Sequence, residues 1–425
     1  MGIYPGPMIL WGQVEVKGKT ETQHALWVPQ KFDFLYARGD GILQVPFLSS
    51  PLPRSAMDVI QLTQDLVAMP SESQHSNRPI ADFLKDVLQG CDFQVEEVVY
   101  RDDQGVEKVN LVARKGQGPG GLGLFSHMDT VPGGLGWSPF TPIVEEGRLM
   151  GRGSCDMKGP LAATIVAAAR FAAEDLAHPI TIALTADEEV GHTGAHHIVE
   201  ESTLLTENWP TYAVVAEPTN LIPVYAHKGG ARITVTAYGV AAHTSTDRGE
   251  SANFKIAPFL AEMAELAQVF RQEPRFMNHE FDPPTNGFNM VLDDGGTPAN
   301  VTAAKTVCTL ALRAMPNAAF QEAVEMVVAR ARAHGLQVEQ QGFEPFYVDP
   351  NAAVVQAACR AAGVERAVTV PYGTEAVTYQ RFMQTVVLGP GDIAQAHTVG
   401  EWIALDQLQQ AVEVYTRMIR DLCQG

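Results

Sequence analysis

The amino-acid sequence predicts an α/β fold, in which helices cover both faces of a mostly parallel sheet and a ferredoxin-like unit is inserted. Short apolar runs of the kind found in buried strands alternate with stretches of helical periodicity over most of the chain. Residues 230–341 break this alternation with the order β-α-β-β-α-β, and the alternation resumes after them. We therefore expect the middle segment to be a separate unit inserted into the first.

The first part of the α/β unit covers residues 56–229. Its predicted helices are Asp58–Ala68, Pro79–Leu88 and the Ala-rich Pro160–Leu176. Its predicted strands are Val109–Ala113, Gly121–Phe125, Ile180–Leu184 and Tyr212–Ala216. Strands that alternate with helices are typical of parallel sheets, because each crossover helix returns the chain to the same end of the sheet.

The inserted unit and the end of the chain complete the pattern. Residues 230–341 contain predicted strands at Ala231–Gly239, Gly287–Leu292, Thr306–Arg313 and Leu336–Gln341, and predicted helices at Phe254–Arg271 and Ala318–Ala333. Residues 342–425 contain a predicted helix at Asn351–Ala362, a strand at Thr385–Gly389 and a helix at Leu405–Leu422. Residues 1–55 are rich in Pro and Gly, and both an arm packed on the main body and a partly disordered leader would account for them.

Composition and charge narrow the classes of function. A chain of 425 residues that is 46% hydrophobic and 19% charged is expected to form two or three globular domains. Its net charge of −19 argues against a nucleic-acid partner. The 5 cysteines form no CxxC pair, which suits a reducing cytoplasm. We expect no membrane partner, because no run of 18 apolar residues occurs, and the start of the chain is a poor signal peptide.

Five short segments place His, Asp or Glu just after a strand-like run or in a Gly-rich turn. They are FSHMDT with His127 and Asp129, GRGSCDMKG with Asp156, TADEEVG with Glu188 and Glu189, VVAEPT with Glu217, and GPGDIAQAH with His397. In open α/β sheets ligands bind outside the carboxyl ends of the strands. We therefore expect these side chains to converge at one edge of the sheet.

Two imidazoles and three carboxylates form a ligand set for two divalent metal ions. Two ions carry +4 and the three carboxylates −3, which leaves positive charge to bind and ionise a water molecule. Imidazole with carboxylate favours Zn²⁺, with Co²⁺ or Mn²⁺ as alternatives. Of the adjacent Glu188 and Glu189, one can bind metal while the other acts as general base. The carboxylate of Asp129 is expected to accept the second ring N–H of His127.

Each of these residues alone also has an ordinary interpretation. His127 would be a core histidine, Asp156 a helix N-cap, Glu188 and Glu189 an exposed acidic turn, Glu217 a strand-end surface residue, and His397 a loop histidine. Only their combination favours a metal site. A second cluster of histidines lies at the start of a predicted helix: His192, His196 and His197. We interpret them as solvated or as contacting a metal-binding residue.

With these motifs, the chain resembles the M20 family of dinuclear metallohydrolases from about residue 56 to the C-terminus. HMDTVP, GRGSCDMKGP, ADEEVG, AEPT and a late AH occur in the family's order. The resemblance implies that one metal is held by His127 and Glu217 and the other by Glu189 and His397. It further implies that Asp156 bridges the two metals, that Glu188 is the base, and that residues 230–341 form a lid that dimerises.

Three segments resemble family members that release acetate from N-acetylornithine in arginine biosynthesis. They are AHKGGARITVTAYGVAAHTS, GTEA and LGPGDIAQAH. This resemblance implies that His243 reaches the site of a neighbouring subunit in a homodimer, that Asn300 and Arg313 bind the substrate carboxylate, and that Gly373, Thr374 and Glu375 hold the amino-acid end. Thr302-Ala303 departs from the family pattern beside Asn300.

Several alternatives remain beside this interpretation. His243 would equally suit a helix-capping turn, and Arg313 a surface ion pair. Nothing in the metal ligands separates N-acetylornithine from other small N-acyl amino acids, so a desuccinylase, another deacetylase and a dipeptidase or carboxypeptidase of the same family stay open. A non-catalytic binding protein on the same fold is the remaining alternative, although every ligand and the base are present.

Overall fold

The computed structural model describes residues 12–16, 19–23, 35–38, 41–44 and 57–424. The chain divides into two compact units, Met1–Pro53 and Arg54–Gly425. In the first unit, β1 (Gly12–Val16) pairs with β2 (Lys19–Gln23), and β3 (Leu35–Arg38) pairs with β4 (Gly41–Gln44), both antiparallel. The remaining residues of the predicted N-terminal extension, including the start of the chain, lie outside the described residues.

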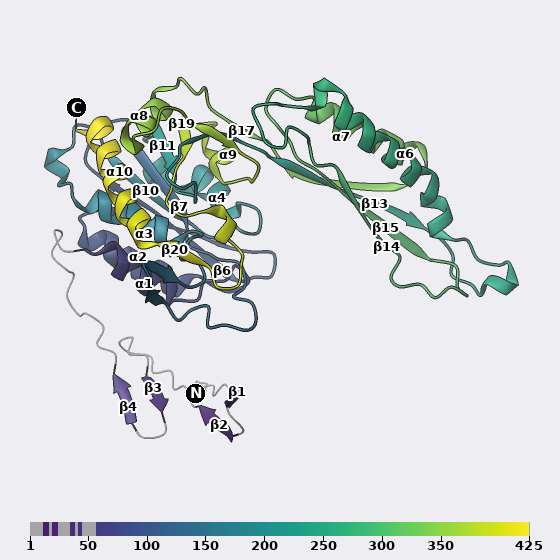
Figure 1. Ribbon diagram of the computed structural model, residues 1–425, viewed down its shortest axis with the longest axis horizontal. Coiled ribbons are helices and arrows are strands. Elements are labelled where there is room, and N and C mark those ends of the chain that lie inside the picture. Colours follow the sequence, from purple (N-terminus) through teal and green to yellow (C-terminus); the bar gives the residue numbers. More distant parts are fainter. Residues whose placement is uncertain (1–11, 17–18, 24–34, 39–40, 45–56, 425) are drawn as a thin grey trace, which may run out of the picture. The chain divides into compact units, whose positions relative to one another are not determined.

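A nine-stranded sheet forms the centre of the second unit (Figure 1). Its strands are β5 (Gln94–Arg101), β6 (Glu107–Lys115), β7 (Leu122–His127), β10 (Ile180–Thr185), β11 (Tyr212–Val215), β12 (Val224–His227), β17 (Phe346–Tyr347), β18 (Val368–Val370) and β19 (Gln384–Val387). The order is β17-β12-β19-β11-β7-β10-β6-β5, and β18 pairs with β12. The adjacent strands β10, β7, β11 and β19 are parallel, whereas β5 and β6 join the sheet antiparallel. The short connection between β5 and β6 explains why these two strands pair antiparallel, because a tight hairpin can link only antiparallel strands.

Helices cover both faces of this sheet, which confirms the predicted α/β class. They are α1 (Val59–Val67), α2 (Arg78–Gly90), α3 (Lys158–Ala169), α4 (Thr193–Glu201), α5 (Thr203–Thr206), α8 (Ala353–Ala362), α9 (Ala376–Tyr379) and α10 (Leu405–Cys423). Alternate strand residues serve different faces: Leu124 packs in the core with α1, α2, α3, α8 and α10, while Phe125 packs with α4, α5 and α9. The sheet is therefore buried on both sides, as a parallel sheet requires.

The helix predicted over Pro160–Leu176 ends earlier than its apolar pattern suggests. α3 stops at Ala169, and the ammonium of Lys115 donates hydrogen bonds to the carbonyl oxygens of Ala168 and Phe171, both at 3.0 Å. The last carbonyls of a helix have no partner within the helix, so a buried cation that binds them favours termination there.

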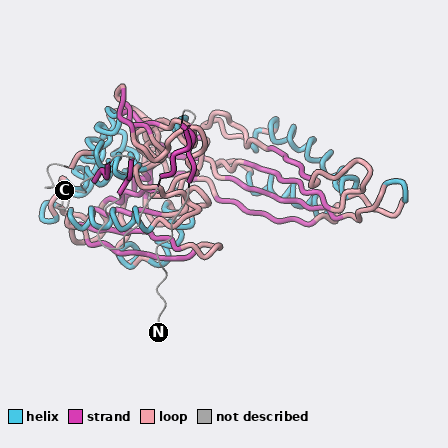
Figure 2. Tube along the Cα trace, turned by 90° about the horizontal axis from the view of Figure 1, so that it is seen from below, coloured by secondary structure: helices cyan, strands magenta, loops and turns pink. Residues whose placement is uncertain are grey.

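A four-stranded antiparallel sheet lies between the two parts of the α/β unit in the sequence. Its strands are β13 (Gly230–Tyr238), β14 (Asn289–Asp293), β15 (Lys305–Leu312) and β16 (Gln337–Phe343), in the order β14-β15-β13-β16. The helices α6 (Ala252–Gln272) and α7 (Phe320–Ala333) pack against it through a separate apolar core (Figure 2). The domain limits 56–229, 230–341 and 342–425 stay a prediction, as does the lid role of the middle segment.

A small three-stranded sheet in the second unit joins parts of the chain that are far apart in the sequence. It consists of β8 (Ile143–Glu145), β9 (Arg148–Met150) and β20 (Trp402–Ala404), in the order β20-β9-β8. The pairing of β9 with β20 brings the segment before Asp156 next to the segment after His397. Within the described part of the chain, no helix combines the length and the apolar character that crossing a bilayer requires.

Candidate active site

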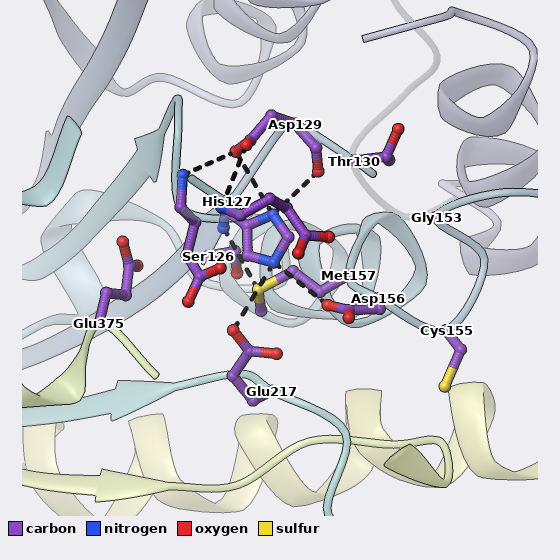
Figure 3. Close-up of polar contacts among 12 residues, drawn as sticks. Ser126, His127, Asp129, Thr130, Gly153, Cys155, Asp156, Met157, Glu217 and Glu375 are labelled. Atoms are coloured by element: carbon purple, nitrogen blue, oxygen red, sulfur yellow. Dashed lines mark hydrogen bonds and ion pairs between the residues drawn. The ribbon is translucent and has the colours of Figure 1, made fainter. Parts of the chain in front are cut away.

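The predicted ligands converge at the carboxyl edge of the central sheet. Figure 3 shows three of them, His127, Asp156 and Glu217. His127 is the last residue of β7, Glu217 follows β11 by two residues, and Glu189 lies in the turn after β10. Because β10, β7 and β11 are parallel neighbours, their carboxyl ends lie at one edge. Asp156 comes from the loop before α3, and His397 from the loop after β19.

The two histidines face opposite oxygens of one aspartate. His127 Nε2 lies 3.2 Å from Asp156 Oδ1 and 3.6 Å from Glu217 Oε1. His397 Nε2 lies 3.3 Å from Asp156 Oδ2 and 2.9 Å from Glu189 Oε2. This is the arrangement that a carboxylate shared between two cations needs, with one imidazole and one further carboxylate on each side.

Both the backbone carbonyl and the carboxylate of Asp129 face the ring of His127, and the carbonyl makes the shorter contact. His127 Nδ1 donates to the carbonyl oxygen of Asp129 at 2.9 Å, while Asp129 Oδ1 is 3.6 Å away. A carbonyl can only accept, so Nδ1 carries the proton and Nε2 faces the cluster. The Asp129 carboxylate also accepts from Ser73 Oγ at 2.7 Å and from the backbone N–H groups of Glu188 and Glu189 at 3.2 and 3.3 Å.

The electrostatics of the cluster favour bound cations. Burial and the charge of Asp156 raise the pKa of Glu217, and they raise the pKa of Glu189 to about 7. Hydrogen bonds to Asp156 and Glu189 raise the pKa of His397 to about 10. Glu189 Oε1 is buried and has no hydrogen-bond partner among the described residues. Such crowded, incompletely paired carboxylates are costly to bury without a positive charge between them.

In each of two groups of residues, the potential ligand atoms lie within 4.8 Å of one another. One consists of His127, Asp156 and Glu189, and the other of His127, Glu188 and Glu217. Glu188, the predicted base, is therefore near enough to ligate as well. The Glu188 carboxylate also contacts His192, whose Nε2 lies 3.3 Å from Glu188 Oε1. The sequence did not predict this contact.

A cavity of about 920 Å³ opens beside the cluster. Asp156, Glu188, Glu189, Glu217 and His397 line it together with Arg313 and Gly373. The other predicted substrate residues do not line it. Thr374 and Glu375 are buried: Thr374 Oγ1 lies 3.1 Å from His227 Nε2, and Glu375 Oε2 accepts from Thr185 Oγ1 at 2.8 Å.

His243 and Asn300 are exposed on the inserted unit and do not line the cavity. His243 Nδ1 lies 2.6 Å from Ser245 Oγ and accepts the backbone N–H of that residue at the start of a short 3₁₀ turn. This is the capping geometry that its sequence context allows. Thr244 N donates to the carbonyl oxygen of Asn300, which joins the two segments.

No pattern in the sequence indicated the residues that hold the ligand-bearing turns. They are Tyr100, Lys108, Arg152, Asp187 and Glu401. All are buried and bonded to residues far away in the chain. A buried charge gives no periodic signal, since only its partner in space explains it. The thiol of the buried Cys155, beside Asp156, donates to the Asp392 carbonyl.

The comparisons with known proteins decide the family. The model of peptidase family M20/M25/M40 matches residues 123–421. The chain belongs to this family. The predicted resemblance is thereby confirmed, and with it the prediction of a hydrolase that acts on amides.

Two relatives are similar to this protein over most of its length. The acetylornithine deacetylase of Myxococcus xanthus is 34% identical over 377 residues, which cover 85% of this chain and 96% of the relative. The acetylornithine deacetylase of Proteus mirabilis (strain HI4320) is 31% identical over 381 residues, covering 86% and 96%. 

Solved structures share the fold at low sequence identity. An M20 family metallo-carboxypeptidase from Sulfolobus solfataricus has a TM-score of 0.69 at 16% identity, covering 85% of this chain and 98% of its own. A dinuclear metal-binding M20 peptidase from Bacillus subtilis has a TM-score of 0.58 at 15% identity, covering 85% and 96%.

Proposed function

We propose that the chain removes the acyl group from small N-acyl amino acids, and that its substrate is N-acetylornithine, which yields ornithine and acetate. One observation carries the proposal: Asp156 lies between two imidazole–carboxylate pairs at the edge of a cavity that also holds Glu188 and Arg313. The choice of substrate is supported by the names of the relatives from Myxococcus xanthus and Proteus mirabilis.

Two divalent metal ions fit the cluster. His127 and Glu217 would hold one ion, Glu189 and His397 the other, and Asp156 both. When bound, such ions lower the pKa of a water molecule and polarise an amide carbonyl. The unpaired buried oxygen of Glu189 and the repulsion among three buried carboxylates support this assignment. Mixed imidazole and carboxylate ligands favour Zn²⁺, with Co²⁺ as the alternative.

Glu188 is the base in this proposal. It lines the cavity and would take a proton from the attacking water and deliver it to the leaving amine. His192 Nε2, 3.3 Å from Glu188 Oε1, contacts one oxygen of this carboxylate. Arg313 is exposed to the same cavity, where its guanidinium suits the substrate carboxylate.

His243 and Asn300, which the sequence predicts to contact the substrate, can do so only in a second copy of the chain, and otherwise have a different role. We propose that His243, and with it Asn300, acts in the cavity of the neighbouring subunit of a homodimer, since neither lines the cavity of its own chain. The 5 cysteines are all free and buried, which supports a reducing cytoplasm as the location.

A substrate panel tests the proposal. The chain is stripped with a chelator, reloaded with Zn²⁺ or Co²⁺, and assayed on N-acetylornithine, N-acetylcitrulline, N-succinyl-diaminopimelate and a dipeptide. We expect N-acetylornithine to show the highest kcat/KM. A higher value for the succinyl compound or the dipeptide would replace the substrate but keep the chemistry. No turnover of any member by a chain that binds two metals would support the non-catalytic alternative.

A further inference from the structure

A buried ammonium lies behind the turn that carries Glu188. Lys108, on β6, is 1% exposed, and its Nζ donates to Asp187 Oδ1 at 2.7 Å, to the backbone carbonyl of His75 at 3.3 Å and to the backbone carbonyl of Ser73. An ammonium has three N–H groups, so every donor of this buried charge has an acceptor.

The two segments that Lys108 joins are the ones that hold the Asp129 carboxylate. Ser73 donates its hydroxyl to Asp129 Oδ2 at 2.7 Å. Asp187 directly precedes Glu188 and Glu189, whose backbone N–H groups donate to the two oxygens of the same carboxylate. One lysine thus connects both sides of the network that surrounds the base.

Asp187 also sets the direction of the chain after β10. Its φ of 57° lies in the left-handed region, which costs energy for a residue with a Cβ. Both carboxylate oxygens are held, Oδ1 by Lys108 and Oδ2 by the hydroxyl of Tyr100 at 2.8 Å. In an extended strand Glu188 and Glu189 would point in opposite directions, whereas after this turn both line the cavity.

We propose that Lys108, acting with Tyr100 through Asp187, is a positioning residue that sets Glu188 and Glu189 relative to the metal ligands. The inference rests on the proposed function of the site. Stability alone does not explain the pair, because a buried ion pair is often no better for stability than apolar residues of the same volume. Its position explains it, because the anchored carboxylate of Asp187 is adjacent in sequence to the base and two positions from a proposed ligand.

The strand β6 supplies a matched control. Lys115 is also buried, at 2% exposed, and it also donates to backbone carbonyls, but those belong to the end of α3, away from the cavity. Lys108→Met and Lys115→Met each remove one buried ammonium from the same strand. Only Lys108→Met also removes the ammonium that binds the carboxylate of Asp187.

The test compares both variants as metal-loaded full-length chains. We expect Lys108→Met to lower kcat about 10–100-fold, with KM within about twofold of the parent, and to weaken metal binding about 10-fold in competition with a chelator. Lys115→Met should lose comparable thermal stability yet keep kcat and metal affinity within about twofold. Equal kcat and metal affinity in the two variants would overturn the proposal.

Two further variants keep the test decisive. If Lys108→Met does not fold, Tyr100→Phe removes only the second anchor of Asp187, and unchanged kcat and metal affinity would contradict the positioning role. In Lys108→Met combined with Asp187→Asn, the buried partner of Lys108 is neutral as well, and its other carboxylate partner, Asp102, is 23% exposed to solvent. Stability should therefore recover while kcat stays low. If the parent chain hydrolyses no N-acyl amino acid, the proposed function fails, and the positioning role is then judged by metal affinity alone.

Discussion

Glu401 Oε1 accepts the backbone N–H of Asp156 at 3.0 Å, although the two residues are 245 positions apart. The same oxygen accepts the N–H of Cys155 at 2.8 Å, and Oε2 accepts from Gly153 N at 3.0 Å and Arg152 Nη1 at 2.7 Å. Glu401 follows His397 by four residues. One loop therefore carries a proposed ligand and also the carboxylate that holds the proposed bridging aspartate.

This relationship predicts a metal-binding defect in Glu401→Gln. The amide of glutamine turns one acceptor into a donor that faces N–H groups, so the Asp156 loop should loosen. We expect metal affinity to fall about 10–100-fold, measured by chelator competition. The control is Glu413→Gln. Glu413 lies on α10, and the change removes its exposed ion pair with Arg170. Equal affinity in the two variants would contradict a role for Glu401 at the site.

Glu188→Gln separates the two roles that the geometry allows for Glu188. As the base, its loss should lower kcat by about 10²–10⁴-fold while two metals per chain remain bound. Glu200→Gln, an exposed change on α4, should leave both quantities unchanged. Metal content and turnover are measured on the same samples. Loss of one metal together with activity would make Glu188 a ligand, as its place near His127 and Glu217 permits.

Glu375 gives the protein a stability that depends on pH. Burial, followed by the charge of Glu188, raises the pKa of Glu375 from its ordinary value of 4.5 to about 7. The folded state therefore holds this proton more tightly than the unfolded state, and the contribution is complete below about pH 4.5 and lost as pH rises through about 7.

We expect Glu375→Gln to abolish that loss. Between pH 5 and 8 the free energy of unfolding of the parent should fall relative to the variant by about 2–3 kcal/mol. Urea unfolding at several pH values measures the difference. Glu413→Gln, which changes an exposed side chain, is measured alongside as the control variant. A flat difference for Glu375→Gln would show that the carboxyl is ionised when folded.

The proposed action of His243 in a neighbouring subunit predicts complementation. His243→Ala and Glu188→Gln should each be nearly inactive as pure proteins. After mixed refolding, half of the dimers contain one copy of each variant, and one of their two sites is complete, so activity should recover to about a quarter of the parent value. Recovery is measured against each variant refolded alone. Without recovery, His243 acts in its own chain or only caps its turn.

Local patterns were sufficient to predict much of this site. His127 and Glu217 each follow a run of buried strand residues, and parallel neighbours end at the same edge, so their convergence follows from the order of elements. Asp129 shows where such reasoning stops. Its carboxylate is two residues from His127 in the sequence, yet the fold directs it to the backbone of Glu188 and Glu189. That contact depends on how two loops meet, which no local pattern contains.

The sequence by itself determined the class of fold, the family and the residue types gathered at the sheet edge, because strand burial and motif spacing are properties of neighbouring residues. Only the tertiary structure decided which groups hold those residues in place. Lys108 reaches Asp187 across 79 positions and Glu401 reaches Asp156 across 245. The physical reason is that a buried charge is stable only beside its partners in space, and the sheet and its loops, not the order of residues, bring those partners together.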